Sequence, residues 1–302
     1  MNTPVLLLFF NRPDKASLVL ERVRLVKPKR LYLHVDGPRE SHSGELEQVA
    51  ACRALQQSID WPCTVFTLFR ERNMGLRDGV SGALNWFFEA EEEGIVLEDD
   101  CLPDPSFFTF CEILLEKYRD NEQVMHIAGT NLAHEKMAGL DTSFFFSRFN
   151  VVWGWASWRR AWNKMTLDLD GLDDYINNKR MDDFIPLPAV QAYLLNKFRK
   201  TRSREQNSWA YAWFFSTLKH KGICIVPAKN LVENVGVGVE DATNTGTNVE
   251  HLMAKACSIE FPLKYPESME PRMDLDIELF YHSQKSRLRL LIWFLLYRLG
   301  LR

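Results

Sequence analysis

The sequence predicts an α/β fold built on a mostly parallel, doubly wound sheet. Short apolar runs alternate with amphipathic helical patterns through residue 125, and polar residues stand directly after several of those runs. Strands that alternate with helices pair in parallel, and ligands bind at the carboxyl ends of such strands. The length of 302 residues suits one large domain or two closely packed ones.

Four strands and four helices are expected in this first region. The strands are the short apolar runs Val5–Phe10, Arg30–Val35, Cys63–Arg70 and Gly94–Leu97. The helices are Pro13–Val26, Gly44–Gln57, Asp78–Glu93 and Asp104–Tyr118. Pro13 suits the first turn of its helix, and Asp104 followed by Pro105 is typical of an N-cap and a first helical position.

Polar residues follow three of the predicted strands. They are Asn11 and Arg12 after the first strand, Asp36 after the second, and Glu98, Asp99 and Asp100 after the fourth. Because the carboxyl ends of parallel strands meet at one edge of the sheet, these side chains are expected to form a ligand crevice.

The three consecutive carboxylates repel one another unless water or a cation offsets their charge. Their hard oxygens suit Mg²⁺ or Mn²⁺, which keep several waters and are typically completed by substrate phosphates. A solvated strand end is the other explanation. The position after a buried type of strand favours the metal site.

A second candidate segment, Arg70–Gly79, joins a predicted strand to a helix. Its arginines could face a phosphate, since a helix N-terminus also favours an anion. Solvated loop charges would explain each arginine taken singly. Gly75 and Gly79 indicate a close approach of the backbone to another group.

From Val124 to Gly238 the pattern becomes irregular and rich in tryptophan and tyrosine. Most of these aromatic side chains are expected in the core, while some could line an acceptor cleft, because aromatic faces also stack on sugars. The segment Val232–Asn248 is predicted to be a loop.

Composition narrows the class of protein. The net charge of −3 and the pI near 6.2 give no overall attraction to nucleic acid. The six cysteines and seven histidines show no metal-ligand spacing, which indicates reduced thiols in a cytosolic protein. The N-terminal apolar run lacks a basic flank and is short, so a strand is expected there rather than a signal peptide.

The last segment, residues 285–302, is a short apolar stretch with lysine and arginine on its flanks. It is shorter than the roughly 17–25 residues needed to span a bilayer, so an amphipathic helix lying on the membrane surface is favoured over a core helix. The predicted organisation is a half that carries the ligand crevice (1–125), a second half of the same domain (126–250), a linker region (251–284) and the surface helix (285–302).

Several motifs in order resemble GT-A glycosyltransferases of the N-acetylglucosaminyltransferase I type and their bacterial relatives. The motifs are Phe10-Asn11-Arg12-Pro13, Val35-Asp36-Gly37, Arg72-Asn73-Met74-Gly75-Leu76, Val96-Leu97-Glu98-Asp99-Asp100, Pro103-Asp104-Pro105, Gly154-Trp155, Trp209 with Trp213, and Ile225-Val226-Pro227. The resemblance covers Val5 to Gly238 and implies a Rossmann-like GT-A sheet and a nucleotide-diphospho-sugar donor. It makes residues 1–125 the nucleotide-sugar-binding half and residues 126–250 the acceptor and catalytic half of the same domain.

The resemblance also implies roles for single residues. Asp100 coordinates Mn²⁺ or Mg²⁺ on the donor diphosphate, Glu98 and Asp99 contact the ribose and donor sugar, and Asp36 contacts the base, usually uracil. The same nucleotide site includes Asn11, Arg12, Arg72 and Asn73. The implied reaction inverts the anomeric carbon, with a carboxylate deprotonating the acceptor hydroxyl.

That catalytic base is where the sequence departs from the family pattern. An Asp is expected before or within the tryptophan pair, yet Asn207–Trp213 contains none. Glu205 is the nearest candidate for the base, and Glu240 or Asp241 in the later loop are the alternatives.

The expected function is an inverting glycosyltransferase that acts on a glycan or lipid-linked acceptor at the inner face of the cytoplasmic membrane. One alternative is a sugar nucleotidyltransferase, but the first strand runs into Phe10-Asn11-Arg12-Pro13 rather than a glycine-rich phosphate loop. Another alternative is a non-catalytic scaffold that binds a nucleotide-sugar or a glycan.

Overall fold

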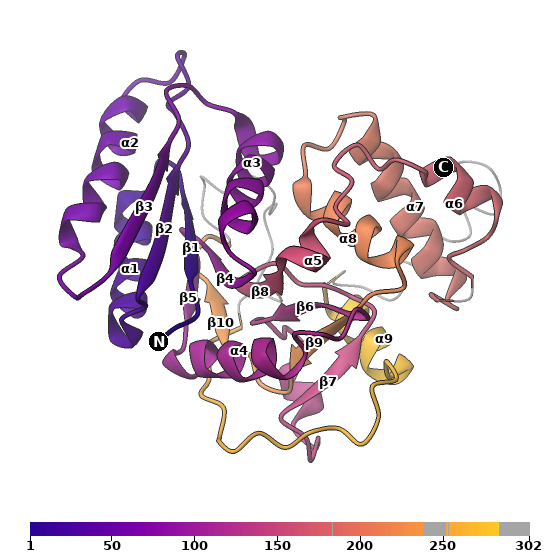
Figure 1. Ribbon diagram of the computed structural model, residues 1–302. Coiled ribbons are helices and arrows are strands. Elements are labelled where there is room, and N and C mark those ends of the chain that lie inside the picture. The colour runs from indigo at the N-terminus through magenta and orange to yellow at the C-terminus, as the bar shows by residue number, and fades with distance from the viewer. Residues whose placement is uncertain (183, 238–251, 253, 284–302) are drawn as a thin grey trace.

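A computed structural model describes residues 1–182, 184–237, 252 and 254–283 (Figure 1). Its strands are β1 (Val5–Phe9), β2 (Arg30–Val35), β3 (Thr64–Phe69), β4 (Glu93–Glu98), β5 (Cys101–Pro103), β6 (Val124–Ala128), β7 (Phe144–Ser147), β8 (Trp155–Trp158), β9 (Ile223–Pro227) and β10 (Val232–Asn234). Its α-helices are α1 (Pro13–Val26), α2 (Glu45–Ala54), α3 (Gly75–Ala90), α4 (Pro105–Lys117), α5 (Arg159–Trp162), α6 (Leu172–Asn177), α7 (Pro188–Arg202), α8 (Trp209–Lys219) and α9 (Met273–Ser283).

One eight-stranded sheet runs through both predicted halves, in the order β3-β2-β1-β4-β8-β6-β9-β7. The first three pairs in this order, β3 with β2, β2 with β1 and β1 with β4, are parallel. The strand β8 then pairs antiparallel with both β4 and β6. The predicted α/β fold with a mostly parallel sheet is therefore confirmed.

Helices cover both faces of the sheet because successive strand residues point to opposite sides. Leu7 of β1 packs in a core with residues of α1, α2 and α4, whereas its neighbours Leu6 and Leu8 pack with residues of α3 and α8. Near-continuous apolar strands are typical of a parallel sheet that is buried on both faces. The carboxyl ends of β1 and β4 border a cavity.

The eight predicted elements of the first half are all present, with boundary differences. Helix α3 begins at Gly75, before the predicted Asp78, and ends at Ala90. The helix begins earlier because Asp36, which is distant in the sequence, caps its first turn: the Asp36 carboxylate accepts the backbone N–H groups of Met74 and Gly75. The predicted helix Gly44–Gln57 is shorter, with α2 passing into the 3₁₀ helix Leu55–Ser58.

Tryptophan side chains build the core of the second half, as predicted for most of them. Trp155 packs against Trp162, Trp209 and Trp213, and its ring stacks on His126 with the ring centroids 5.1 Å apart. The buried His126 accepts a hydrogen bond from Trp213 Nε1, and burial lowers its pKa to about 4. This histidine is therefore a neutral core residue at physiological pH.

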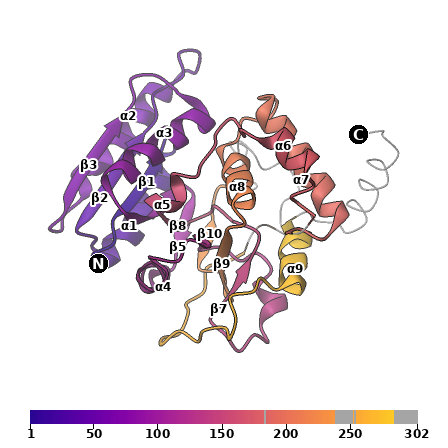
Figure 2. The same cartoon turned by 45° about the vertical axis from the view of Figure 1, so that its right-hand side comes forward.

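Residues 254–283 pack along the second half and end in α9, which lies near α7 in both views (Figures 1 and 2). Asp276 of α9 is buried, accepts hydrogen bonds from Ser147 Oγ and the Arg148 backbone, and pairs with the Arg148 guanidinium. None of the helices in the described ranges has the length and apolarity that a bilayer span requires. The predicted surface helix, residues 285–302, lies outside the described residues.

The start of the predicted loop Val232–Asn248 is a strand instead. Val232–Asn234 forms β10, which pairs antiparallel with Cys101–Pro103 of β5. A three-residue strand without a local signal becomes ordered because its backbone finds this distant partner. The pairing brings Val232 against Gly154, where an added Cβ would lie 2.7 Å from Val232 Cγ2.

Gly154→Ala should lower the free energy of unfolding by about 2 kcal/mol. Gly154 has φ +64°, and the new methyl group would also overlap Val232, so strain and overpacking add together. Urea unfolding of the variant measures the loss. Gly139→Ala is the matched control, because nothing lies within 4 Å of its added Cβ. Equal stability of the two variants would contradict the packing described here.

Candidate active site

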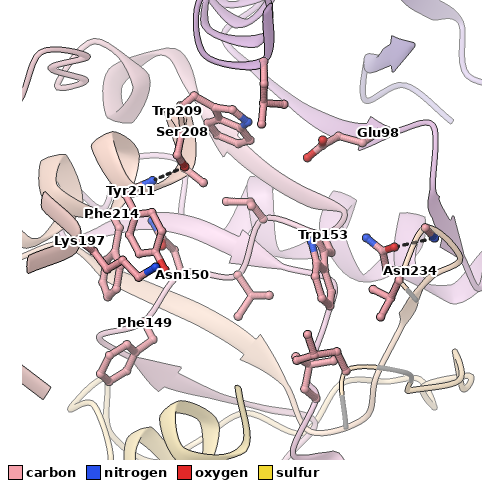
Figure 3. A pocket seen from close by; sticks show the side chains of 18 of the residues that line it. Glu98, Phe149, Asn150, Trp153, Lys197, Ser208, Trp209, Tyr211, Phe214 and Asn234 are labelled. Atoms are coloured by element: carbon pink, nitrogen blue, oxygen red, sulfur yellow. Dashed lines mark hydrogen bonds between the residues drawn. The ribbon is translucent and has the colours of Figure 1, made fainter. Parts of the chain in front are cut away.

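A cavity of about 530 Å³ lies at the carboxyl ends of β1 and β4, a volume typical of small-molecule sites. Arg12, Glu98 and Asp100 line one side. Side chains from α7, α8 and the segment before β8 line the other side, as Figure 3 shows for Lys197, Tyr211 and Asn150. The cavity therefore joins the two predicted halves at the edge where the sequence placed a crevice.

Arg12 is the cation that offsets the charge of the acidic triplet. Its Nε donates to Asp99 Oδ2 over 3.1 Å, and its Nη2 donates to Asp99 Oδ1. The same Nη2 donates to Asp100 Oδ2 over 3.0 Å. Asp99 is only 4% exposed, so both of its oxygens serve this internal ion pair.

Glu98 lines the cavity, and its carboxylate has no hydrogen bond or ion pair with any other described side chain. Burial, together with the negative charges of Asp100 and Asp99, raises its pKa to about 8. Burial also raises the pKa of Asp99 to about 6, against the opposing effect of Arg12. One arginine thus relieves only part of the repulsion among three acids, and Glu98 keeps its capacity to bind a ligand.

Asp100 is fixed by the segment around β10. Asn234 Nδ2 donates to Asp100 Oδ1 over 3.3 Å, and the Val235 N–H donates to the Asp100 carbonyl over 2.9 Å. Gly236 passes so close that an added Cβ would lie 2.9 Å from Asp100 Cγ. Sequence reasoning assigned no role to Asn234 or Gly236, because only the pairing of β10 with β5 brings them to the triplet.

The carboxylates fit a divalent cation that a ligand helps to hold. Within the described ranges, no group of three His, Cys, Asp or Glu side chains is placed to enclose a metal. Glu98 and Asp100 nevertheless both face the cavity. Two hard carboxylates suit Mg²⁺ or Mn²⁺ when waters and phosphate oxygens complete the coordination.

Asp36 lies at the predicted edge but does not line the cavity. The carboxylate is buried and accepts the N–H groups of Gly37, Met74 and Gly75, and burial raises its pKa. Asn73 donates its side-chain amide to the Gly37 carbonyl over 3.0 Å. In this structure the two side chains hold the β2 end against the start of α3, and a contact with the base stays a prediction.

Asn11 and Arg72 also stand beside the cavity rather than in it. Asn11 Nδ2 donates to Glu45 Oε1 over 2.9 Å, and Glu45 is held by Arg39. Arg72 is exposed, and its backbone crosses Gly37 so closely that no side chain would fit at that glycine. A role in nucleotide binding stays a prediction for both residues.

The predicted bases fall in two different places. Glu205 is exposed after α7, accepts a hydrogen bond from Ser203 Oγ over 3.0 Å, and lines a separate hollow with Lys200 and Arg202. It is not among the side chains that line the main cavity. Asp241 and Glu240 lie outside the described residues. The identity of the base stays a prediction.

Aromatic side chains form much of the wall opposite the acids. Tyr193, Tyr211 and Phe214 line this side, and Trp153 lines the cavity near Asn234, so some aromatic residues do face a cavity, as the sequence suggested. Lys197 extends over the Tyr211 and Tyr193 rings, with Nζ 5.3 and 5.6 Å from their centroids. Neither Tyr193 nor Lys197 carried a recognisable signal in the sequence.

No protein-family model and no curated protein matches the sequence. Among solved structures, an apo UDP-glucose pyrophosphorylase has 8% identity and a TM-score of 0.38, with 75% of this chain and 90% of that chain covered. The apo form of mouse xyloside xylosyltransferase 1 has 12% identity and a TM-score of 0.36, with 73% and 82% covered. Such distant likenesses assign neither family nor activity, so the function is argued from the site.

Glu98→Gln should make the protein more stable at alkaline pH in the presence of EDTA. The folded pKa of Glu98 is raised from 4.5 to about 8, so the folded state binds more protons than the unfolded state between these values. The free energy of unfolding of the wild type therefore falls as pH rises through this window. It should fall less in the variant, which we expect to be more stable than the wild type by about 1–2 kcal/mol at pH 9.

Urea unfolding from pH 5 to pH 9 measures the effect. Glu47→Gln, an exposed glutamate on α2, is the control and should keep the wild-type profile. A Glu98→Gln profile parallel to that of the wild type would show that Glu98 is not electrostatically destabilised in the folded state.

Proposed function

We propose that the cavity binds a nucleotide-diphospho-sugar and that the protein transfers the sugar, with inversion, to a hydroxyl of a glycan or lipid-linked acceptor. The observation that carries the proposal is Glu98, a partly buried carboxylate without a partner in the described chain, beside Asp100 on a cavity wall. UDP is the nucleotide that the motif resemblance implies.

The acidic wall favours a diphosphate that arrives with a divalent cation. Asp100, with Glu98 beside it, would hold Mn²⁺ or Mg²⁺, and the ion would supply Lewis-acid stabilisation to the leaving diphosphate. Arg12 contributes a fixed positive charge at the same wall, because Asp99 holds its guanidinium from behind. The Arg12 guanidinium would therefore already be oriented when the phosphates bind, so little side-chain entropy would be lost on binding.

The opposite wall supplies surfaces for the acceptor. Tyr211 presents a partly exposed ring to the cavity, and aromatic faces bind the apolar faces of sugar rings. The acceptor hydroxyl also needs a carboxylate within about 2.6–3.2 Å to take its proton. Glu205 and Asp241 stay the predicted candidates for that role.

One observation favours a scaffold as the second candidate function. Glu98 and Asp100 are the only carboxylates that line the cavity within the described part of the chain. A protein without a base would bind a nucleotide-sugar and release UDP no faster than the uncatalysed reaction. Release of UDP from UDP-sugars in the presence of Mn²⁺, even if slow, would indicate an enzyme. No release above the uncatalysed rate would indicate a scaffold.

Asp100→Ala should abolish the Mn²⁺-dependent binding of UDP. The wild type should be stabilised by UDP with Mn²⁺ by about 2.7 kcal/mol at a hundredfold excess over Kd, and less in EDTA, because the ligand binds only the folded state. Thermal unfolding with and without UDP measures the difference. Asp120→Ala, at an exposed acid, is the control and should retain the stabilisation. Undiminished binding by Asp100→Ala would remove the metal role from this residue.

Glu205→Gln tests the predicted base. If Glu205 takes the acceptor proton, turnover should fall by about 10²–10⁴-fold while the affinity for UDP stays that of the wild type. The assay follows UDP release with the donor that stabilises the protein most among a panel of nucleotide-sugars. A wild-type rate would assign the base to another carboxylate, with Asp241→Asn as the next variant.

A further inference from the structure

We propose that the outer edge of β3 pairs antiparallel with β3 of a second copy of this chain, so that the two eight-stranded sheets join across a two-fold axis. β3 is the first strand in the sheet order, next to β2, and Figure 2 shows it at the outer margin of the molecule. No residue of β3 lines the cavity, so the pairing does not depend on the proposed function.

β3 leaves half of its backbone hydrogen-bonding groups without a neighbouring strand. The N–H groups of Thr64 and Arg70 donate to carbonyls in or beside β2, so the even-numbered residues of β3 direct their backbone groups toward β2. Because these groups alternate in direction along a strand, those of Val65, Thr67 and Phe69 point away from the sheet. No hydrogen bond to these three backbones is found among the described residues. Such a row of unpaired groups is a template for another strand.

The strand lacks the features that keep the sheet edges of monomers from pairing. Thr64–Phe69 contains no charged residue and no proline, and its register with β2 is unbroken over all six residue pairs. None of its residues is buried, whereas every residue of β7, at the other edge of the sheet, is buried. Monomers usually protect an edge strand with lysine, proline, a bulge or a covering element. β3 therefore has the composition of a paired strand.

β3 is complementary to itself in one antiparallel register. When Thr67 lies opposite Thr67 of the second copy, Val65 lies opposite Phe69, and all the outward-facing backbones form hydrogen-bonded pairs. Phe66 then lies opposite Leu68 of the second copy on the other face. Thr–Thr pairs and pairs of apolar side chains both stabilise neighbouring strands.

Phe66 supplies apolar surface at this edge. Its ring stacks on Tyr32 of β2 with the centroids 4.5 Å apart, and Trp86 of α3 meets the same tyrosine edge-on at 5.0 Å. Phe66 is still 37% exposed, and Trp86 is half-buried. Leu68 of the second copy would cover part of this surface, and aromatic side chains are enriched among those that contribute most to interface affinity.

The charges that flank the strand also suit an antiparallel partner. Asp60 precedes the strand, is exposed, and has one carboxylate oxygen, Oδ2, held by Arg24. The segment Arg70–Arg72 follows the strand and carries two arginines and one glutamate. Antiparallel pairing brings the start of each strand near the end of the other, so Asp60 would approach a segment of net positive charge. Parallel pairing would instead place like charges together.

Sedimentation equilibrium of the full chain tests the pairing. A six-residue edge is short, so we expect an affinity in the micromolar range. The weight-average mass of the wild type should rise from that of one chain, 35.2 kDa, toward twice this value as the concentration increases from about 1 to about 200 µM.

Charges at Thr67 test the two-fold register. Because Thr67 would face itself, Thr67→Asp and Thr67→Lys should each weaken dimerisation at least about tenfold through like-charge repulsion. An equimolar mixture of the two variants should regain about the wild-type affinity, since opposite charges would then face each other. Thr67 is exposed, so both variants should fold, which far-UV circular dichroism checks. Gln123→Asp, at an exposed position before β6, adds the same charge away from β3 and should dimerise like the wild type.

A wild type that remains monomeric at the highest concentration would overturn the inference and leave this edge to a strand of another protein. Dimerisation that is unchanged in Thr67→Asp would also overturn it. The same holds if the mixture of Thr67→Asp and Thr67→Lys stays monomeric, because a two-fold pairing at Thr67 requires that opposite charges restore the dimer.

Discussion

The ion pair between Arg12 and Asp99 is the interaction on which the site depends. β1 and β4 lie side by side with Leu8 opposite Glu98, so the segments that follow them carry Arg12 and Asp99 to one point at the sheet edge. A buried carboxylate that loses its partner costs about 3–5 kcal/mol. Arg12 removes this cost and also reaches Asp100, which allows an acidic triplet to stand at the end of a buried strand.

The ion pair between Arg12 and Asp99 also determines which carboxylate of the triplet is available to bind a ligand. Asp99 turns into the protein toward Arg12, while Glu98 and Asp100 face the cavity. Asp100 is further restrained by Asn234 and by the close approach of Gly236. Glu98 alone among the three keeps a carboxylate with no partner in the described chain, and burial together with the charges of Asp100 and Asp99 raises its pKa.

The cavity takes its lining from both halves of the fold. Its acidic wall comes from loops of the parallel strands, whereas Lys197 and Tyr211 come from α7 and α8 in the second half. The tryptophan core around Trp155 joins the halves, because Trp155 and Trp213 share one core cluster with Phe88 of α3.

The sequence by itself determined the four parallel strands, the helices between them and the edge at which Arg12, Asp36 and the acidic triplet gather. These features depend on apolar periodicity and on capping residues such as Asp104, whose side chain accepts the Ser106 N–H two residues away. Only the tertiary structure decided that Asp36 caps α3, that Asp99 serves Arg12, and that Asn234 reaches Asp100. The reason is physical: Asn234 and Asp100 are 134 residues apart, and no local pattern encodes a contact that forms only when distant strands pair.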